Sequence, residues 1–253
     1  MTDLPEREPE RDIFAVLRGL TQARIGLGRA GQALPTRAML EFQTDHARAR
    51  DAVHAVLDVE RMRRMLGDGP VVRSAAGDRA RYLQDPDLGR RLAEDTAGLE
   101  PDYWDLAIVV GDGLSATAVH AHAAAVVKAL QGCLPGWRIA PVVLAMQARV
   151  ALGDDVAERL GARAVVMLLG ERPGLSAPDS LGAYLTWAPL RGTRDSARNC
   201  VSNIRTPGGL APDDAARKIA WLLNAARRLG ASGVALKDRS DDAILPPDGD
   251  AAV

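Results

Sequence analysis

The residues best placed for chemistry follow a short apolar run in the C-terminal half of the chain. Five apolar residues, 165–169, precede Gly170 and then a charged pair, Glu171 and Arg172. An apolar run of this length with turn residues behind it is typical of a strand buried on both faces. Ligands of open α/β sheets bind beyond the carboxyl ends of the strands, so Glu171 is a candidate ligand contact. A solvated ion pair that ends the strand would explain the same residues.

A second polar segment, RNCVSNIR, occupies residues 198–205 and contains one of the two cysteines, Cys200. A thiol becomes a good nucleophile when a neighbouring base or cation favours the thiolate. No histidine lies near Cys200 in the sequence. A packed or ligand-facing thiol is therefore favoured over a catalytic one.

A glycine pattern, G-x-G-x-x-[GA], begins at Gly111 and ends at Ala116, between a predicted strand and a predicted helix. This is the context of a dinucleotide-binding fingerprint, so a free-standing dinucleotide-dependent oxidoreductase is one hypothesis. Asp112 speaks against it, because a carboxylate there would repel a pyrophosphate. The acidic residue expected after the next strand is also missing, since residues 145–147 are Ala-Met-Gln. A glycine turn into a packed helix explains the same pattern.

Two histidines, His120 and His122, are two residues apart within a predicted helix. At that spacing their side chains point to different sides of the helix, so they cannot ligate one metal ion together. No cysteine or acidic pair nearby completes a site. We therefore predict no metal site in this chain.

Composition limits the function classes. The chain has 253 residues, a formal net charge of −1 and 47% hydrophobic residues, which is typical of a globular protein with a sizeable core. Near-zero charge gives no general attraction to nucleic acid or to an anionic membrane. Two cysteines do not make a disulfide framework, which favours a reducing cytoplasm. No apolar run approaches the roughly 20 residues that cross a bilayer, and the charged N-terminus is unlike a secretory signal.

The N-terminal third predicts helices and no sheet. Residues 1–11 are charged and Pro-rich, so we expect disorder there. Residues 12–100 should form a helical extension, in which a long helix begins near Thr36, a possible cap. Phe42 and His46 fall on one apolar face of that helix. A histidine in such a stripe is usually a core or interface residue rather than a ligand.

The remainder alternates between short apolar runs and helical patterns. Residues 101–238 therefore predict an α/β domain with a mainly parallel, Rossmann-like sheet flanked by helices. Pro141 should place the second strand near an edge. A helix that starts at Pro212 ends before Gly230, and the Asp- and Pro-rich residues 239–253 should be disordered. Strands are expected at 105–110, 139–144, 164–169, 183–187 and 233–236.

Several stretches carry a resemblance to a known family. They include DLAIVVGDGLSATAVHAH, RIAPVVLAMQARVALGDD, GERPGLSAPDSLGAYLTW, RNCVSNIR and SGVALKD, which occur in the family's order. With the N-terminal stretch that begins ARIGLGRAGQ, they extend from about Ala23 to Lys237. The chain thereby resembles the small (light) subunit of ethanolamine ammonia-lyase.

The resemblance implies a non-catalytic subunit of a carbon–nitrogen lyase that converts ethanolamine to acetaldehyde and ammonia. A barrel-shaped large subunit would hold ethanolamine and supply the catalytic side chains, and residues 12–100 would dock on it. Adenosylcobalamin would lie between the subunits. The family's cofactor contacts correspond to Val150, Glu171 and Cys200, and their loops should line one edge of the sheet.

The residue types suit a corrin ring, whose rim carries amide arms. Glu171 can accept a hydrogen bond from an amide NH2, and backbone groups near Val150 and Cys200 can pair with other arms. The chain lacks the D-x-H-x-x-G pattern by which some cobalamin proteins replace the lower base with histidine, so the cofactor should stay base-on. Its radical chemistry belongs to the cofactor and the large subunit. We expect a cytoplasmic hetero-oligomer and leave open whether it enters a bacterial microcompartment.

Overall fold

The computed structural model describes residues 13–240. The disorder predicted for residues 1–11, and for 239–253 apart from Arg239 and Ser240, lies outside this range. The chain divides into two compact units, residues 1–48 and 49–253. The domain boundaries that we placed at residues 100 and 238 stay predictions. No helix of the described part is both long and apolar enough to span a membrane.

The first unit contains α1 (Ala15–Leu20) and most of α2 (Thr36–His54). A glycine-rich segment joins the two helices and packs closely within the unit. A Cβ on Gly26 would lie 2.3 Å from Cγ of Phe14, so only glycine fits there. Arg24 of the same segment pairs with Asp45 of α2 at 2.7 Å. The segment is therefore anchored to its neighbours and is more than a bare linker.

The apolar face predicted for the long helix is exposed on α2. Phe42 is 41% exposed, and His46 is exposed as well. α1 has no buried residue, and Leu20 at its end is 80% exposed. The described part of the first unit thus presents apolar side chains that this unit itself leaves uncovered.

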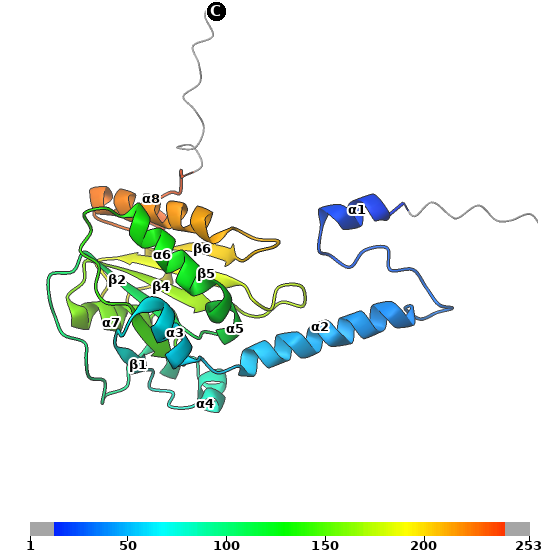
Figure 1. The fold of residues 1–253 in the computed structure, drawn as a ribbon, viewed down its shortest axis with the longest axis horizontal. Coiled ribbons are helices and arrows are strands. Elements are labelled where there is room, and N and C mark those ends of the chain that lie inside the picture. The colour runs from blue at the N-terminus through cyan, green and yellow to red at the C-terminus, as the bar shows by residue number, and fades with distance from the viewer. Residues whose placement is uncertain (1–12, 241–253) are drawn as a thin grey trace, which may run out of the picture. The chain divides into compact units, whose positions relative to one another are not determined.

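The second unit contains a six-stranded sheet in the order β1-β3-β2-β4-β5-β6 (Figure 1). Strands β1, β3, β2 and β4 are parallel to one another, whereas β5 is antiparallel to β4 and β6 is antiparallel to β5. The sheet is mixed, so the mainly parallel, Rossmann-like sheet that we predicted is not confirmed. The strands are β1 (Val71–Arg73), β2 (Leu106–Gly111), β3 (Val143–Met146), β4 (Ala164–Gly170), β5 (Leu181–Trp187) and β6 (Arg198–Ile204).

Three strand predictions were wrong, one of them at β6, which occupies residues where we expected a loop. β1 comes from the N-terminal third, where we expected no strand, and it pairs with β3 at the edge of the sheet. The closing strand expected at 233–236 is a single 3-10 turn, η4 (Gly233–Ala235). Gly233 has a φ of +72°, and a Cβ there would lie 2.1 Å from the Ser196 carbonyl oxygen, so the chain turns closely past its neighbour instead of extending. The strand predicted around Pro141 begins after that residue as β3, next to the edge strand.

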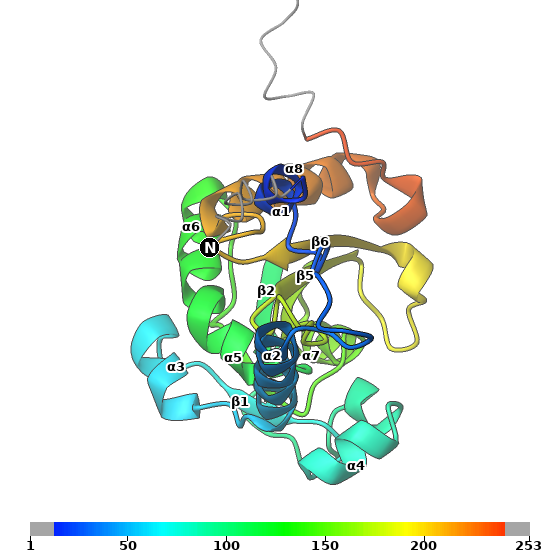
Figure 2. The ribbon, with the colours of Figure 1, turned by 90° about the vertical axis from the view of Figure 1, so that its right-hand side faces the viewer.

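Helices cover the sheet on both sides (Figures 1 and 2). α6 and α8 pack together on one face, and α7 packs on β2 and β4 from the other. α8 (Pro212–Leu229) confirms its prediction, with Pro212 in its first turn and Gly230 ending it in the left-handed conformation. The other helices are α3 (Val59–Leu66), α4 (Arg79–Gln84), α5 (Ala116–Ala118), α6 (Ala124–Cys133) and α7 (Leu152–Leu160), with the shorter turns η1 (Leu88–Arg90), η2 (Val119–Ala123) and η3 (Asp195–Ala197).

Alternate residues of the strands enter two different cores. Along β2, Ile108 points into the core shared with α6 and α8, whereas Ala107 points into the core under α7. Burial on both faces explains the unbroken apolar runs of the sequence. β5 follows the same alternation, with Leu185 in the first core and Tyr184 against the second, but Tyr184 is only partly buried. The face that carries Tyr184 is where polar side chains gather.

Candidate functional site

A cavity of about 400 Å3 opens on the α7 side of the sheet, where β5 and β6 pass the start of α7. Its lining includes Val150, Tyr184 and Cys200. Two of the three predicted site residues, Val150 and Cys200, thus come together in one cavity although they are far apart in the sequence.

We expected Cys200 in a loop at the end of a strand, and this prediction was wrong. Cys200 lies within β6, directly opposite Tyr184 of β5, and it is exposed. Directly opposed residues of paired strands share one face of a sheet, so both side chains point to the α7 side. The predicted arrangement of three loops along one edge of the sheet is therefore wrong for Cys200, whose side chain lies on the α7 face of the sheet.

Glu171 directly follows β4, as predicted, and its carboxylate lies over β5. Oε2 accepts hydrogen bonds from the Ser180 hydroxyl and from the Asn203 backbone N–H, the latter at 3.2 Å. A Cβ on Gly182 would lie 2.7 Å from Oε1 of Glu171 and 3.0 Å from Cε2 of Tyr184. Glycine therefore makes room for a carboxylate beside the tyrosine ring. Within the described residues no donor reaches Oε1, so the protein holds one carboxylate oxygen and leaves the other without a hydrogen bond.

An irregularity in β6 supplies the backbone N–H that reaches Glu171. The register of β5 and β6 shifts between Leu181 and Ala183, and Asn203 has a φ of +57°. β-bulges redirect backbone groups and are frequent beside functional sites. Here the shift coincides with an Asn203 N–H that donates to Glu171 rather than to β5.

Burial governs the two titratable groups that face each other across the strands. Burial raises the pKa of Tyr184, with smaller contributions from Cys200 and Glu171. Burial also raises the pKa of the Cys200 thiol, while a contact of 3.1 Å between its Sγ and Oγ of Ser202 lowers it in part. The thiol is therefore protonated at neutral pH. This supports the ligand-facing interpretation of Cys200 over the catalytic one.

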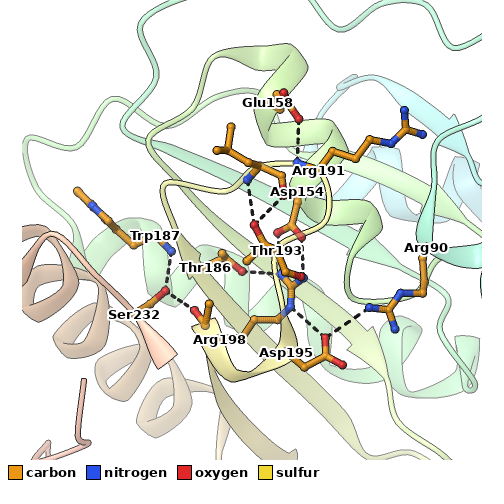
Figure 3. Close-up of polar contacts among 12 residues, drawn as sticks. Arg90, Asp154, Glu158, Thr186, Trp187, Arg191, Thr193, Asp195, Arg198 and Ser232 are labelled. Carbon is orange, nitrogen blue, oxygen red and sulfur yellow. Dashed lines mark hydrogen bonds and ion pairs between the residues drawn. The ribbon is translucent and has the colours of Figure 1, made fainter. Parts of the chain in front are cut away.

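Arg198 of β6 forms an ion pair with Asp154 of α7 beside the cavity (Figure 3). Its side chain is 4% exposed, and its two Nη atoms each donate to the Asp154 carboxylate at 2.7 Å. Nη1 also donates to the Thr186 hydroxyl, and Nη2 donates to the Thr193 carbonyl. Burial raises the pKa of Asp154, and the hydrogen bonds from Arg198 oppose this shift. The guanidinium is committed to the protein, so Arg198 forms a wall of the cavity rather than a ligand-binding group.

The predicted dinucleotide fingerprint has an internal role in the structure. Asp112 accepts hydrogen bonds from the backbone N–H groups of Gln147 and Ala148, each at 3.0 Å, and so shapes the loop that leads to Val150. Burial raises the pKa of Asp112, and these backbone hydrogen bonds oppose the shift. A Cβ on Gly113 would lie 2.3 Å from a backbone oxygen of β4. These contacts favour the glycine-turn interpretation over a nucleotide site.

The two histidines contact different neighbours. Nε2 of His120 accepts a hydrogen bond from the Asp58 N–H at 2.9 Å, and Nε2 of His122 lies 3.5 Å from the Asp179 carboxylate. Burial lowers the pKa of His120. Within residues 13–240 no group of three His, Cys, Asp or Glu side chains is placed to hold a metal ion.

Sequence reasoning did not single out three other residues that line the cavity, Tyr184, Arg149 and Arg90. Tyr184 could have been found from the alternation along its strand, which places it opposite the core residues. Arg149 directly precedes Val150, so its position in that loop was visible. Arg90 lies far away in the N-terminal third, and no local pattern marks it.

Comparison with known proteins agrees with the resemblance seen in the sequence. The family model "Ethanolamine ammonia-lyase light chain (EutC)" matches residues 11–237. A protein of Xanthomonas campestris pv. campestris named ethanolamine ammonia-lyase small subunit is 51% identical over 253 residues, which cover 95% of this chain and 93% of that protein. The protein of the same name from Bradyrhizobium diazoefficiens is 56% identical over 237 residues, covering 89% and 90% of the two chains. One from Pseudomonas putida is 51% identical over 252 residues, covering 94% and 92%.

Proposed function

The chain belongs to the ethanolamine ammonia-lyase light-chain family, and from that premise we propose that it is the non-catalytic, cofactor-binding subunit of this enzyme. The complex is a carbon–nitrogen lyase that converts ethanolamine to acetaldehyde and ammonia. Its reacting side chains come from a large subunit, and adenosylcobalamin binds between the two. A cytoplasmic location stays a prediction of the sequence, and entry into a microcompartment stays an open question.

The observation that carries the proposal is the meeting of three residues from separate loops and strands. Val150 and Cys200 line one cavity, and Glu171 reaches the same face beside Tyr184. Tyr184 therefore connects the carboxylate to the cavity. Such a surface, part apolar and part polar, suits one side of a corrin ring with its amide arms.

The donor and acceptor groups present fit this cofactor. Oε1 of Glu171 is open to an amide NH2, and the protonated Cys200 thiol and Ser202 hydroxyl can pair with amide carbonyls. When bound, adenosylcobalamin supplies a cobalt–carbon bond whose homolysis provides the radical. This chain's residues hold and orient the ring. Because Ser180 and the Asn203 N–H fix the carboxylate, Glu171 is prepared for its partner before the ligand arrives.

The first unit supplies a surface for the large subunit. Leu17, Leu20 and Phe42 of its two helices are exposed, and exposed apolar residues in this number are typical of a protein–protein contact. Since the family is that of a small subunit, the partner that we propose for this surface is the large subunit.

Co-expression of the two subunits tests the proposal. Ethanolamine-dependent acetaldehyde release should require both chains together with adenosylcobalamin, and activity from the large subunit alone would refute it. In the purified complex, Glu171→Ala should weaken adenosylcobalamin binding about 10- to 100-fold, measured by visible absorbance, because it removes a charged acceptor.

A matched control separates binding from assembly. Arg172→Ala changes the neighbouring, exposed side chain and should leave both properties unchanged. Gel filtration should show that both variants assemble like the wild type. If Glu171→Ala lost the large subunit instead of the cofactor, Glu171 would be an assembly residue.

Titration of the chain with NAD tests the alternative hypothesis of a dinucleotide-dependent oxidoreductase. Our proposal expects no binding of NAD.

A further inference from the structure

We infer that Arg149, together with Arg90, binds the phosphodiester in the nucleotide loop of the base-on cofactor. This inference rests on the proposed function and extends it to a part of the ligand that Val150, Glu171 and Cys200 leave without a partner. It concerns two guanidinium groups that line the same cavity.

Arg149 is held in place but keeps most of its donors. Its backbone N–H donates to the Gly89 carbonyl at 2.8 Å, and its Cζ lies 4.4 Å from the centre of the Tyr82 ring. The shortest side-chain hydrogen bond that it makes runs from Nη2 to the Tyr82 carbonyl at 3.4 Å, which is long. Nε is buried without a partner. Stacking therefore orients a guanidinium whose hydrogen-bonding capacity is largely unused.

Arg90 adds a second positive charge to the cavity. Its nearest carboxylate is that of Asp195, at 3.7 Å from Nη2, beyond hydrogen-bonding distance. Asp195 is 72% exposed, so water and salt screen its charge. Arg198, the third arginine of the lining, is fully engaged by Asp154. Two under-engaged cations thus remain for a ligand.

Only one group of the nucleotide loop carries the negative charge that would pair with these two guanidinium groups. The corrin amides, the adenosyl group and dimethylbenzimidazole are neutral, whereas the phosphodiester is the one anionic group of the nucleotide loop. Guanidinium groups match phosphate oxygens with paired hydrogen bonds. A cavity of about 400 Å3 accommodates part of a corrinoid rather than all of it. The phosphodiester would lie beside Arg90 and Arg149, while Val150, Cys200 and Glu171 contact the corrin ring and its amide arms.

The test compares two corrinoids on the assembled complex of both subunits. Adenosylcobinamide keeps the corrin amides but lacks the phosphodiester and the base. Arg149→Met keeps an unbranched apolar side chain and removes the guanidinium, and with it both the charge and the stacking on Tyr82. Its Kd for adenosylcobalamin should rise about 10- to 100-fold, whereas its Kd for adenosylcobinamide should equal that of the wild type. Arg149→Lys should fall between the two for adenosylcobalamin. Equilibrium dialysis measures each Kd without any turnover.

Salt dependence gives a second, independent measurement. Raising the ionic strength should weaken binding of adenosylcobalamin to the wild type and should affect the double variant Arg90→Met, Arg149→Met less. Equal losses for both corrinoids, no loss for either, or an unchanged salt dependence would each overturn the inference. If the wild-type complex bound neither corrinoid, the proposed function itself would fail.

Discussion

The two faces of β5 and β6 differ in their surroundings: one packs in the hydrophobic core and the other borders a cavity. On one face Leu181, Leu185 and Val201 are sealed into the core with α8. On the other, Tyr184 and Cys200 border a cavity, because α7 packs mainly on β2 and β4 and covers these two strands only in part. The alternation of a strand thus lets one element contribute to the core on one face and line a cavity on the other. Substitutions on the first face should change stability, and those on the second should change ligand binding.

Arg198 should be the strongest exception to this division between the two faces. It lies on the cavity face, yet it is buried, so its substitution should change stability. Arg198→Met leaves the buried Asp154 carboxylate without its counter-charge. We expect the free energy of unfolding at pH 7 to fall by about 3–5 kcal/mol. Denaturant unfolding of the full chain measures this change.

The pH dependence of that loss has a definite sign. Burial raises the pKa of Asp154, and removing Arg198 would raise it further. A carboxyl group with a folded pKa above its unfolded value stabilises the fold fully below the unfolded pKa, and this contribution is lost as pH rises through the folded pKa. The deficit of Arg198→Met should therefore shrink from pH 7 to pH 5. A deficit that does not depend on pH would mean that the lost packing, and not the unpaired charge, dominates.

Leu185→Ala should confirm the structural role of the α8 face, with the next largest effect. Leu185 is buried in the core, so truncation should lower the free energy of unfolding by about 2–5 kcal/mol. The Kd of the complex for adenosylcobalamin, measured at a temperature where the variant is folded, should not change. A weaker affinity in the folded variant would show that the two faces are coupled through β5.

Cys200 should show the smallest effect on the fold. Cys200→Ala should change the free energy of unfolding by no more than about 0.5 kcal/mol, because the side chain is exposed. Burial nevertheless raises the pKa of the thiol, so its alkylation by iodoacetamide should be slow at pH 7 and accelerate only above the pH at which an ordinary thiol ionises. Bound adenosylcobalamin should protect it. Rapid alkylation at pH 7 would contradict a protonated thiol.

Local signals predicted the elements whose ends are marked in the sequence. Pro212 and Gly230 delimit α8, and the apolar runs that became β2 and β4 were plain because both faces of these strands are buried. β1 was missed because a strand of three residues is defined by its pairing with β3 rather than by its own composition. η4 was misread because Gly233 permits a close turn that an apolar run does not reveal.

The site was predicted as a set of residues but not as a geometry. The resemblance pointed to Val150, Glu171 and Cys200, yet their placement on one face depends on the antiparallel pairing of Tyr184 with Cys200. The wall of the cavity depends on the contact of Arg198 with Asp154, which lies on a different element. Residues of different elements meet only in the folded chain, so their spacing in the sequence does not predict the contact.

The short edge strand β1 has a consequence for the order in which the fold opens. It pairs with β3 alone and through only three residues, so it ranks among the least protected parts of the sheet in amide hydrogen exchange. The segment that follows it carries Tyr82 and Arg90. Opening of β1 and this segment as one cooperative unit would dismantle the stacking platform of Arg149 while β2 and β4 stay closed. One wall of the cavity thus depends on a segment that follows a weakly paired edge strand.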